Sequence, residues 1–159
     1  MARRPPTYDA VIGTPFGRLG IRTQDDRLVD INFLSTRTPL RSPHTVFARR
    51  VCRELKAYLT DPRHTLRLPL AFIGSAHAVR VWRALQRIPA GQVRTYGELA
   101  RRLQSSPRAI GGACRRNPIA IVVPCHRVVA AGELGGFMGK RSGSALAIKR
   151  WLLAHEQQR

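Results

Sequence analysis

The hydrophobic pattern of this chain changes near residue 40 from strand-like to mainly helical spacing, and this change limits what the chain can fold into. Residues 7–35 are short apolar runs separated by turn-forming residues, among them Gly13-Thr14-Pro15 and Gln24-Asp25-Asp26. Such a pattern predicts a small β-meander. From residue 42 onwards most apolar residues recur at helical spacing instead. Strands followed by helices predict an α+β fold.

Signals for helix starts divide the second part of the chain. Ser42 followed by Pro43 predicts an N-cap and a helix that runs to about residue 59. A second helix is predicted from Ser75 to a stop at residues 89–91, and a last one from Ser144 to about Glu156. Residues 60–75 contain proline, are loosely patterned and predict a linker. The 159 residues would then form two small domains, 1–70 and 71–159.

Two short helices are predicted between these segments. Thr95 and Glu98 fit a capping box at the start of the first, and Ser106 followed by Pro107 starts the second. The tight turn between the two makes them a candidate helix-turn-helix.

One face of the second short helix has an unusual composition. Arg108, Gly111, Gly112 and Arg115 are spaced i, i+3, i+4 and i+7, so they form one stripe. Each glycine inside a helix costs roughly 1 kcal/mol relative to alanine. A stripe without side chains between arginines suits a close approach to a DNA backbone or groove. Tight packing of one helix on another is the alternative explanation for the glycines.

The charge of the chain indicates a polyanionic partner. The formal net charge is +19, and residues 80–159 hold 15 of the 28 cationic but three of the nine acidic side chains. Cations that neutralise phosphates release counterions, which favours nucleic acid as the partner. A solubilising, arginine-rich surface is the alternative. No apolar run approaches 18 residues and no secretory signal follows Met1, so we expect no membrane contact and a cytoplasmic protein.

The three cysteines are predicted to differ in role. Cys52 and Cys114 lie in amphipathic patterns and are interpreted as core residues, and their spacing indicates neither disulfides nor a zinc site. Cys125 follows an apolar run, 119–123, that predicts a buried strand, and it precedes His126 and Arg127. A neighbouring histidine or positive charge lowers a thiol pKa and favours the thiolate. A Cys-His pair can equally be structural. The other histidines are scattered, so we expect no metal and no cofactor.

Residues 121–129, Ile-Val-Val-Pro-Cys-His-Arg-Val-Val, resemble the active-site signature of the O6-alkylguanine-DNA alkyltransferases, also called methylated-DNA–protein-cysteine methyltransferases. Residues 14–19 are similar to the first domain of that family, which implies a ribonuclease-H-like fold for 1–70 as a supporting domain. The second domain would then bind DNA and accept the alkyl group. Other matches, in the same order along the chain, are Val81-Trp82, Ile88-Pro89, Gly91, Thr95-Tyr96, 108–111, Asn117-Pro118 and 149–156.

The resemblance implies a role for each matching residue. Cys125 would accept the alkyl group irreversibly, in one turnover, while His126, through a water, and Glu156 remove the thiol proton. Tyr96 would help to rotate the target nucleotide and protonate the departing guanine, and Asn117 would tie the recognition helix to the active-site segment. Arg108 would fill the gap left in the duplex, because the helix-turn-helix enters the minor groove and the damaged base is flipped out. The other expected DNA contacts are Gly111, Gly112, Arg115, Tyr96 and Arg127, and the expected pocket residues are Val128, Phe137, Met138, Gly139 and Cys114.

The resemblance leaves two alternatives, and the chain departs from the family's pattern at three places, one of which is the segment 139–143, longer than in some members. The first alternative is an alkyltransferase-like protein, which would bind lesions tightly without transferring the alkyl group, although those relatives have tryptophan where this chain has Cys125. The second is a plain helix-turn-helix DNA-binding protein, in which Cys125 would be only a buried residue. His77 stands where the family commonly has glutamine and is interpreted as a hydrogen-bonded core or interface residue. Phe137 stands where some members have tyrosine, so it can stack on a base but cannot donate a hydrogen bond.

The expected partner is double-stranded DNA containing O6-alkylguanine, with O4-methylthymine left open. We expect a monomer that joins the nucleoid when it binds DNA.

Overall fold

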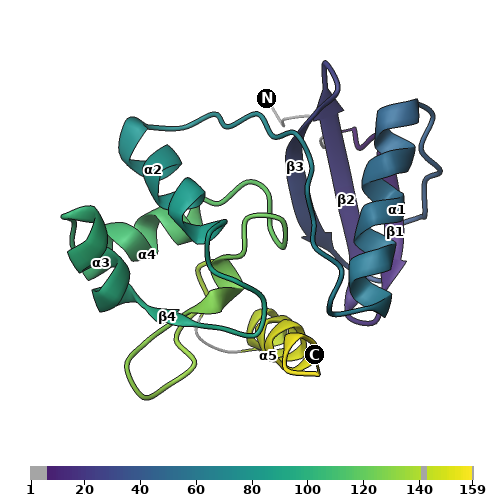
Figure 1. Ribbon diagram of the computed structural model, residues 1–159. Helices are drawn as coiled ribbons and strands as arrows, with labels where there is room; N and C mark the ends of the chain where they lie inside the picture. Colours follow the sequence, from purple (N-terminus) through teal and green to yellow (C-terminus); the bar gives the residue numbers. More distant parts are fainter. Residues whose placement is uncertain (1–6, 141–142, 159) are drawn as a thin grey trace, which may run out of the picture.

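A computed structural model of the chain describes residues 7–140 and 143–158, so residues 1–6, where no secretory signal is expected, lie outside the described part. Three strands, β1 (Ala10–Thr14), β2 (Gly17–Gln24) and β3 (Arg27–Leu34), form an antiparallel sheet in the order β1-β2-β3. The β-meander prediction is therefore confirmed. The helix α1 (Val46–Thr60) covers one face of this sheet (Figure 1) and buries Phe47, Val51, Leu55 and Tyr58 against it.

The predicted start of α1 is wrong by three residues. The N-cap is Thr45, whose Oγ1 accepts a hydrogen bond from the Ala48 amide at 3.0 Å, and Ser42 does not start the helix. The reason is tertiary: Arg41 exchanges two backbone hydrogen bonds with Val11 of β1, at 3.0 and 3.1 Å. That pairing holds the chain extended beside the sheet, so the helix begins at the next residue that can cap it.

Residues 61–75 lack regular structure, as predicted, but they are more than a linker. The Leu28 amide donates to the Pro69 carbonyl at 2.9 Å, and the Ala71 amide donates to the Leu28 carbonyl at 3.0 Å. The segment therefore pairs with β3 before it crosses to α2 (Figure 1). Leu66, Leu68, Leu70 and Phe72 are half-buried against the core.

The helical part follows its capping signals closely. The helices α2 (Ala76–Leu85), α3 (Tyr96–Leu103) and α4 (Pro107–Arg115) begin after the N-caps Ser75, Thr95 and Ser106, and the capping box of α3 is present. Gln104 takes a left-handed conformation, φ 53°, in the turn between α3 and α4. The Trp82 indole donates to the Ala113 carbonyl at 2.9 Å and joins α2 to α4. These contacts confirm the helix-turn-helix arrangement.

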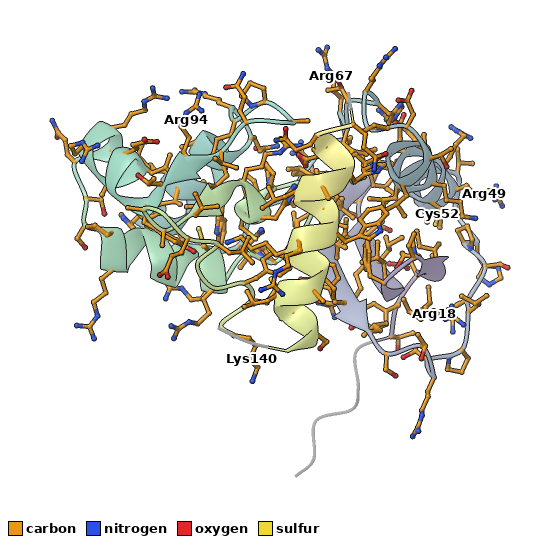
Figure 2. All side chains as sticks on the ribbon, turned by 90° about the horizontal axis from the view of Figure 1, so that it is seen from below. Arg18, Arg49, Cys52, Arg67, Arg94 and Lys140 are labelled. Atoms are coloured by element: carbon orange, nitrogen blue, oxygen red, sulfur yellow. The ribbon has the colours of Figure 1, made fainter. Side chains whose placement is uncertain are left out.

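The last helix, α5 (Ser144–Glu156), lies between the helical part and the sheet (Figures 1 and 2). Trp151 of α5 meets Phe16 edge-on, with ring centroids 5.2 Å apart, so the helix also packs on the N-terminal part. Two short strands, β4 (Arg94–Thr95) and β5 (Val128–Val129), pair in parallel and connect the start of α3 to the cysteine segment. None of the described helices has both the length and the hydropathy needed to cross a membrane.

Candidate active site and DNA interface

The segment before Cys125 is a compact buried turn and not the predicted strand. The Asn117 side chain spans it, donating from Nδ2 to the Val123 carbonyl at 2.8 Å and accepting at Oδ1 from the Ile119 amide at 3.0 Å. The Val122 amide bonds to the Ala120 carbonyl at 2.9 Å around Ile121, whose φ is 74°. This is the strained form of the γ-turn, which an apolar run does not signal. Asn117 thus shapes the chain that leads to Cys125.

Cys125 begins the one-turn 3-10 helix η1 (Cys125–Arg127) and is 4% exposed. Burial raises the pKa of its thiol, while a hydrogen bond from the Asn117 side chain and the charge of Lys149 act in the opposite direction and offset burial only in part. The thiol is therefore protonated at neutral pH in the free protein. A reaction at this sulfur needs a group that takes the proton away.

His126 and Glu156 form a buried pair beside the cysteine. His126 Nε2 contacts Glu156 Oε1, and both side chains are almost completely buried. Burial opposes the charge of Glu156, but His126 and Arg127 outweigh it and hold the pKa of that carboxyl at about 2. The pKa of His126 is lowered, because burial and the charges of Arg127 and Lys149 outweigh the pull of Glu156. We therefore assign a charged Glu156 and a neutral His126 at neutral pH.

These charge states define the tautomer of His126. A carboxylate only accepts hydrogen bonds, so Nε2 carries the proton that points at Glu156. Nδ1 is then the basic nitrogen, and it is buried with no hydrogen-bond partner among the described residues. The site consequently contains a protonated thiol and an unused base in adjacent residues, and a carboxylate that orients the base. This is the arrangement of an activated nucleophile.

Arg127, expected as a DNA contact, is placed elsewhere by the structure. Its Nε donates to Glu156 Oε2 at 2.8 Å, its Nη2 to Oε1 at 3.0 Å and its Nη1 to the Ile88 carbonyl at 2.6 Å. The side chain is 13% exposed. A guanidinium engaged in this way holds the Glu156 carboxylate and leaves little of Arg127 exposed, and its contact with DNA stays a prediction.

Sequence reasoning missed two residues around this site. Tyr58 of α1 donates from Oη to Glu156 Oε1 at 3.0 Å. Lys149 of α5 is fully buried, and its Nζ donates to the carbonyls of Val128, Leu134 and Gly136 at 2.7 to 2.9 Å. A signal was available for both, since each polar group lies on the apolar face of its helix and needs a buried partner.

Lys149 therefore ties down the loop that follows Cys125. Three acceptors require three N–H donors, so the ammonium form fits this site. Burial lowers the pKa of Lys149 to about 8, against the pull of Cys125 and Cys114.

Gly135 lies in the same loop with φ 75°, and a Cβ there would meet the Tyr96 ring at 3.4 Å. The anchored loop thus packs against Tyr96.

The stripe of α4 is open to solvent, as predicted. Arg108 and Arg115 are exposed, and neither makes a hydrogen bond or an ion pair within the described part of the chain. Gly111 and Gly112 are half-buried, and a Cβ at Gly111 would meet nothing nearer than the Tyr96 ring at 4.0 Å. Helix packing does not explain the glycine at 111, so the alternative interpretation loses its support there. Tyr96 lies between this stripe and the loop after Cys125.

The expected pocket residues divide into two groups. Val128, Cys114 and Phe137 are buried, and Phe137 meets Phe33 edge-on with centroids 5.6 Å apart. Its ring is therefore packed in the core of the protein, and stacking of Phe137 on a base stays a prediction. Met138 and Gly139, with φ 52° and 78°, form the tip of a two-residue turn closed by Phe137 and Lys140. A Cβ at Gly139 would lie 3.3 Å from Arg115 of α4, so this tip borders the stripe.

Two further expectations concern histidine and metal. His77 bonds through Nε2 to Ser105 Oγ at 2.8 Å, so it is a hydrogen-bonded interface residue as interpreted. Within residues 7–140 and 143–158, no group of three or more His, Cys, Asp or Glu side chains is arranged to hold a metal ion.

A helix-turn-helix with an open basic stripe, joined to a buried cysteine, base and carboxylate, defines a DNA-binding protein built for transfer to a thiol. The chain matches the family model "6-O-methylguanine DNA methyltransferase, DNA binding domain" over residues 76–158. It is 36% identical to the methylated-DNA–protein-cysteine methyltransferase of Methanosarcina acetivorans, over 94% of this chain and 97% of that one. It is 39% identical to the same enzyme of Mycolicibacterium paratuberculosis, over 92% and 90% of the two chains.

Solved structures agree with these relatives. The O6-methylguanine methyltransferase of Mycobacterium tuberculosis superposes with a TM-score of 0.78 at 33% identity, covering 94% of this chain and 92% of that one. The same organism's protein in complex with DNA gives a TM-score of 0.77 at 35% identity, covering 93% and 92%. The chain belongs to the O6-methylguanine DNA methyltransferase family.

Proposed function

We propose that Cys125 is the residue that accepts the alkyl group in this methylated-DNA–protein-cysteine methyltransferase, which repairs DNA by direct reversal. The observation that carries this assignment is that His126, the residue after the buried Cys125, has a basic Nδ1 with no hydrogen-bond partner among the described residues. Cys52 and Cys114 are buried with raised thiol pKa values and have no adjacent base. They are therefore poor candidates for the acceptor.

The proposed reaction balances within the chain and its DNA substrate. The thiol proton passes to His126 Nδ1 through a bridging water, and Glu156 stabilises the imidazolium that results. The sulfur then forms a bond to the alkyl carbon while the bond from that carbon to guanine O6 breaks. The Tyr96 phenol donates a proton to the departing guanine, and the proton held by His126 returns through water to the resulting phenolate, so that both residues end in their starting forms. Since the new thioether is stable, each molecule reacts once.

The DNA-binding residues are proposed from their placement. Arg108 and Arg115 are free cations on the described face of α4, and Gly111 and Gly112 leave that face without side chains. We propose that this face enters the minor groove, that Arg108 fills the space of the flipped nucleotide and that Tyr96 helps to rotate it. Asn117 links α4 to Cys125 through the buried turn. Val128, Met138, Gly139 and Cys114 are proposed to border the base.

The basic surface supports double-stranded DNA as the partner, and membership of the family supports O6-alkylguanine as the lesion in it. Figure 2 shows cationic side chains in both parts of the molecule, with Arg94 in the helical part, Arg49 at the opposite end and Arg67 between them at the upper edge. Charge distributed in this way draws the whole protein towards a phosphate backbone. A solved relative is in complex with DNA, and this chain binds DNA as well.

Three more assignments are proposals that follow from the family. Residues 1–70 form a supporting domain, and residues 71–159 form the DNA-binding and acceptor domain. The protein acts as a monomer before it binds DNA. It works in the cytoplasm, at the nucleoid when bound, which agrees with three free cysteines in the described residues.

The test is incubation with duplex DNA that carries one O6-methylguanine, followed by peptide mass spectrometry. We expect one added methyl group per chain, located on Cys125. Cys125→Ala should lose transfer and keep its affinity for DNA, while Cys52→Ala serves as the matched control and should keep both. A methyl group on Cys52 or Cys114 would overturn the assignment, and tight binding without transfer would identify a lesion-clamping protein instead.

A further inference from the structure

We propose that Tyr58, on α1 of the N-terminal part, is a positioning residue for alkyl transfer that holds the Glu156 carboxylate in place for His126. The inference rests on the proton relay of the proposed function. It assigns the N-terminal part of the chain a direct contact with the reaction site, in addition to its support of the fold.

The contact is a buried hydrogen bond between residues 98 positions apart. Tyr58 Oη donates to Glu156 Oε1 at 3.0 Å, and this is the same oxygen that His126 Nε2 contacts. Tyr58 is 2% exposed and Glu156 is 1% exposed, so water does not compete for the bond. Burial and the neighbouring charge of Glu156 raise the pKa of Tyr58 far above neutrality, which keeps the phenol a donor at every working pH.

The orientation of Tyr58 is itself enforced by α5. The Tyr58 carbonyl is 2.6 Å from His155 Nε2, and the two rings meet edge-on with centroids 5.3 Å apart. The His155 ring stacks on Trp151 at 4.8 Å, and Trp151 in turn contacts Phe16 of the N-terminal part. The phenol is thus fixed from two sides, by its backbone and by its ring. A group held in this way can fix the carboxylate it touches.

The Glu156 carboxylate accepts hydrogen bonds from several donors, of which Tyr58 is one. Oε1 faces Tyr58 from α1, and His126 and Arg127 from η1, while Oε2 accepts from Arg127. His126 also feels the charge of Lys149 from α5. Each donor to the carboxylate reduces the negative charge left to stabilise a protonated imidazole. Tyr58 therefore helps to keep His126 in its neutral form, with Nδ1 free to accept the thiol proton.

A purely structural role for Tyr58 makes a different prediction from a positioning role. If the ring only fills the core, Tyr58→Phe keeps the ring and leaves the chemistry unchanged. If the hydroxyl positions Glu156, its loss lowers the rate and raises the pKa of His126 together. One hydrogen bond of this kind corresponds to about a twofold to tenfold change in rate.

The experiment measures single-turnover transfer from O6-methylguanine duplex DNA to the full chain across the pH range in which the wild type folds. Tyr58→Phe should transfer about twofold to tenfold more slowly at the plateau. The midpoint of its acidic limb should move to higher pH. Phe16→Leu, which perturbs the same packing without touching Glu156, should leave that midpoint unchanged even if it costs as much stability in urea unfolding. Affinity for undamaged duplex should be the same in all three proteins.

A second substitution covers the case in which Tyr58→Phe is too unstable to assay. Site-specific 3-fluorotyrosine at position 58 keeps the ring and makes the hydroxyl a stronger donor, so the midpoint should move to lower pH. A profile identical to wild type for both substitutions would overturn the proposal, as would a shift of equal size in Phe16→Leu. Glu156→Gln distinguishes a failure of the proton relay from a failure of the role of Tyr58. If Glu156→Gln also leaves the pH profile unchanged, the relay itself is wrong. If it slows transfer while the Tyr58 substitutions do not, only the role of Tyr58 is wrong.

Discussion

Glu156 should make the stability of the protein depend on acid in a way that can be worked out from its contacts. The pKa of this carboxyl is about 2 in the folded protein against an ordinary 4.5, because His126 and Arg127 outweigh the opposing effect of burial. A lowered pKa gives stability that is fully present above pH 4.5 and is lost as the pH falls towards 2. The difference corresponds to about 3 kcal/mol.

The measurement is urea unfolding of wild type and Glu156→Gln at a series of pH values. At neutral pH the variant should be less stable by about 3 kcal/mol, because Arg127 loses a buried charged partner. Below pH 4.5 the gap should narrow by about 1.4 kcal/mol per pH unit, since the wild-type carboxyl becomes protonated in the unfolded chain and the advantage of its ionised form shrinks.

The control is Glu133→Gln, because Glu133 is exposed and its side chain makes no ion pair within the described residues. The difference in unfolding free energy between Glu133→Gln and wild type should be small at neutral pH and should remain small in acid. A gap for Glu156→Gln that is independent of pH would refute the reasoning. It would mean that Glu156 is uncharged in the folded protein or that its partners do not stabilise its charge.

Three other predictions follow from the same structure. Arg108→Ala should slow repair far more than it weakens binding to undamaged duplex, where the salt slope should fall by about one unit; equal losses in the two assays would make Arg108 an ordinary phosphate contact. Gly111→Ala should raise stability to urea by up to about 1 kcal/mol, since a Cβ there meets no close neighbour, yet it should weaken DNA binding; unchanged affinity would remove this face from the interface. Lys149→Met should lower the free energy of unfolding by about 2 kcal/mol or more, because three buried carbonyls lose their donor. Proteolysis should then cut the loop at residues 128–136 faster, and a loop as resistant as in wild type would show that other contacts hold it.

Much of the helical part could be predicted because its signals are local. The caps at Ser75, Thr95 and Ser106 bond to amides three residues ahead, so the sequence around each start contains everything the interaction needs. The same holds for the stripe on α4, whose exposure follows from its spacing. The signature around Cys125 likewise identified the family, because its residues are contiguous.

The errors fall where distant contacts decide the local structure. Ser42 has the form of an N-cap, but the pairing of Arg41 with Val11 keeps that stretch extended. The apolar run 119–123 has the composition of a strand, but the Asn117 side chain folds it into a turn that places Ile121 at φ 74°. A polar side chain outside the run thus determined the conformation within it.

The sequence by itself therefore determined the order of elements, the helix starts with local caps and the identity of the reactive segment. Only the tertiary structure decided which charges turn inward. Arg127 and Arg108 carry the same guanidinium, yet one is bound to a buried carboxylate and the other is exposed on α4. Tyr58 and Glu156 are 98 residues apart and meet because the C-terminal turns of α1 and α5 lie against each other. A hydrogen bond or an ion pair depends on distance in space, and neighbouring positions in the chain report that distance only within one element.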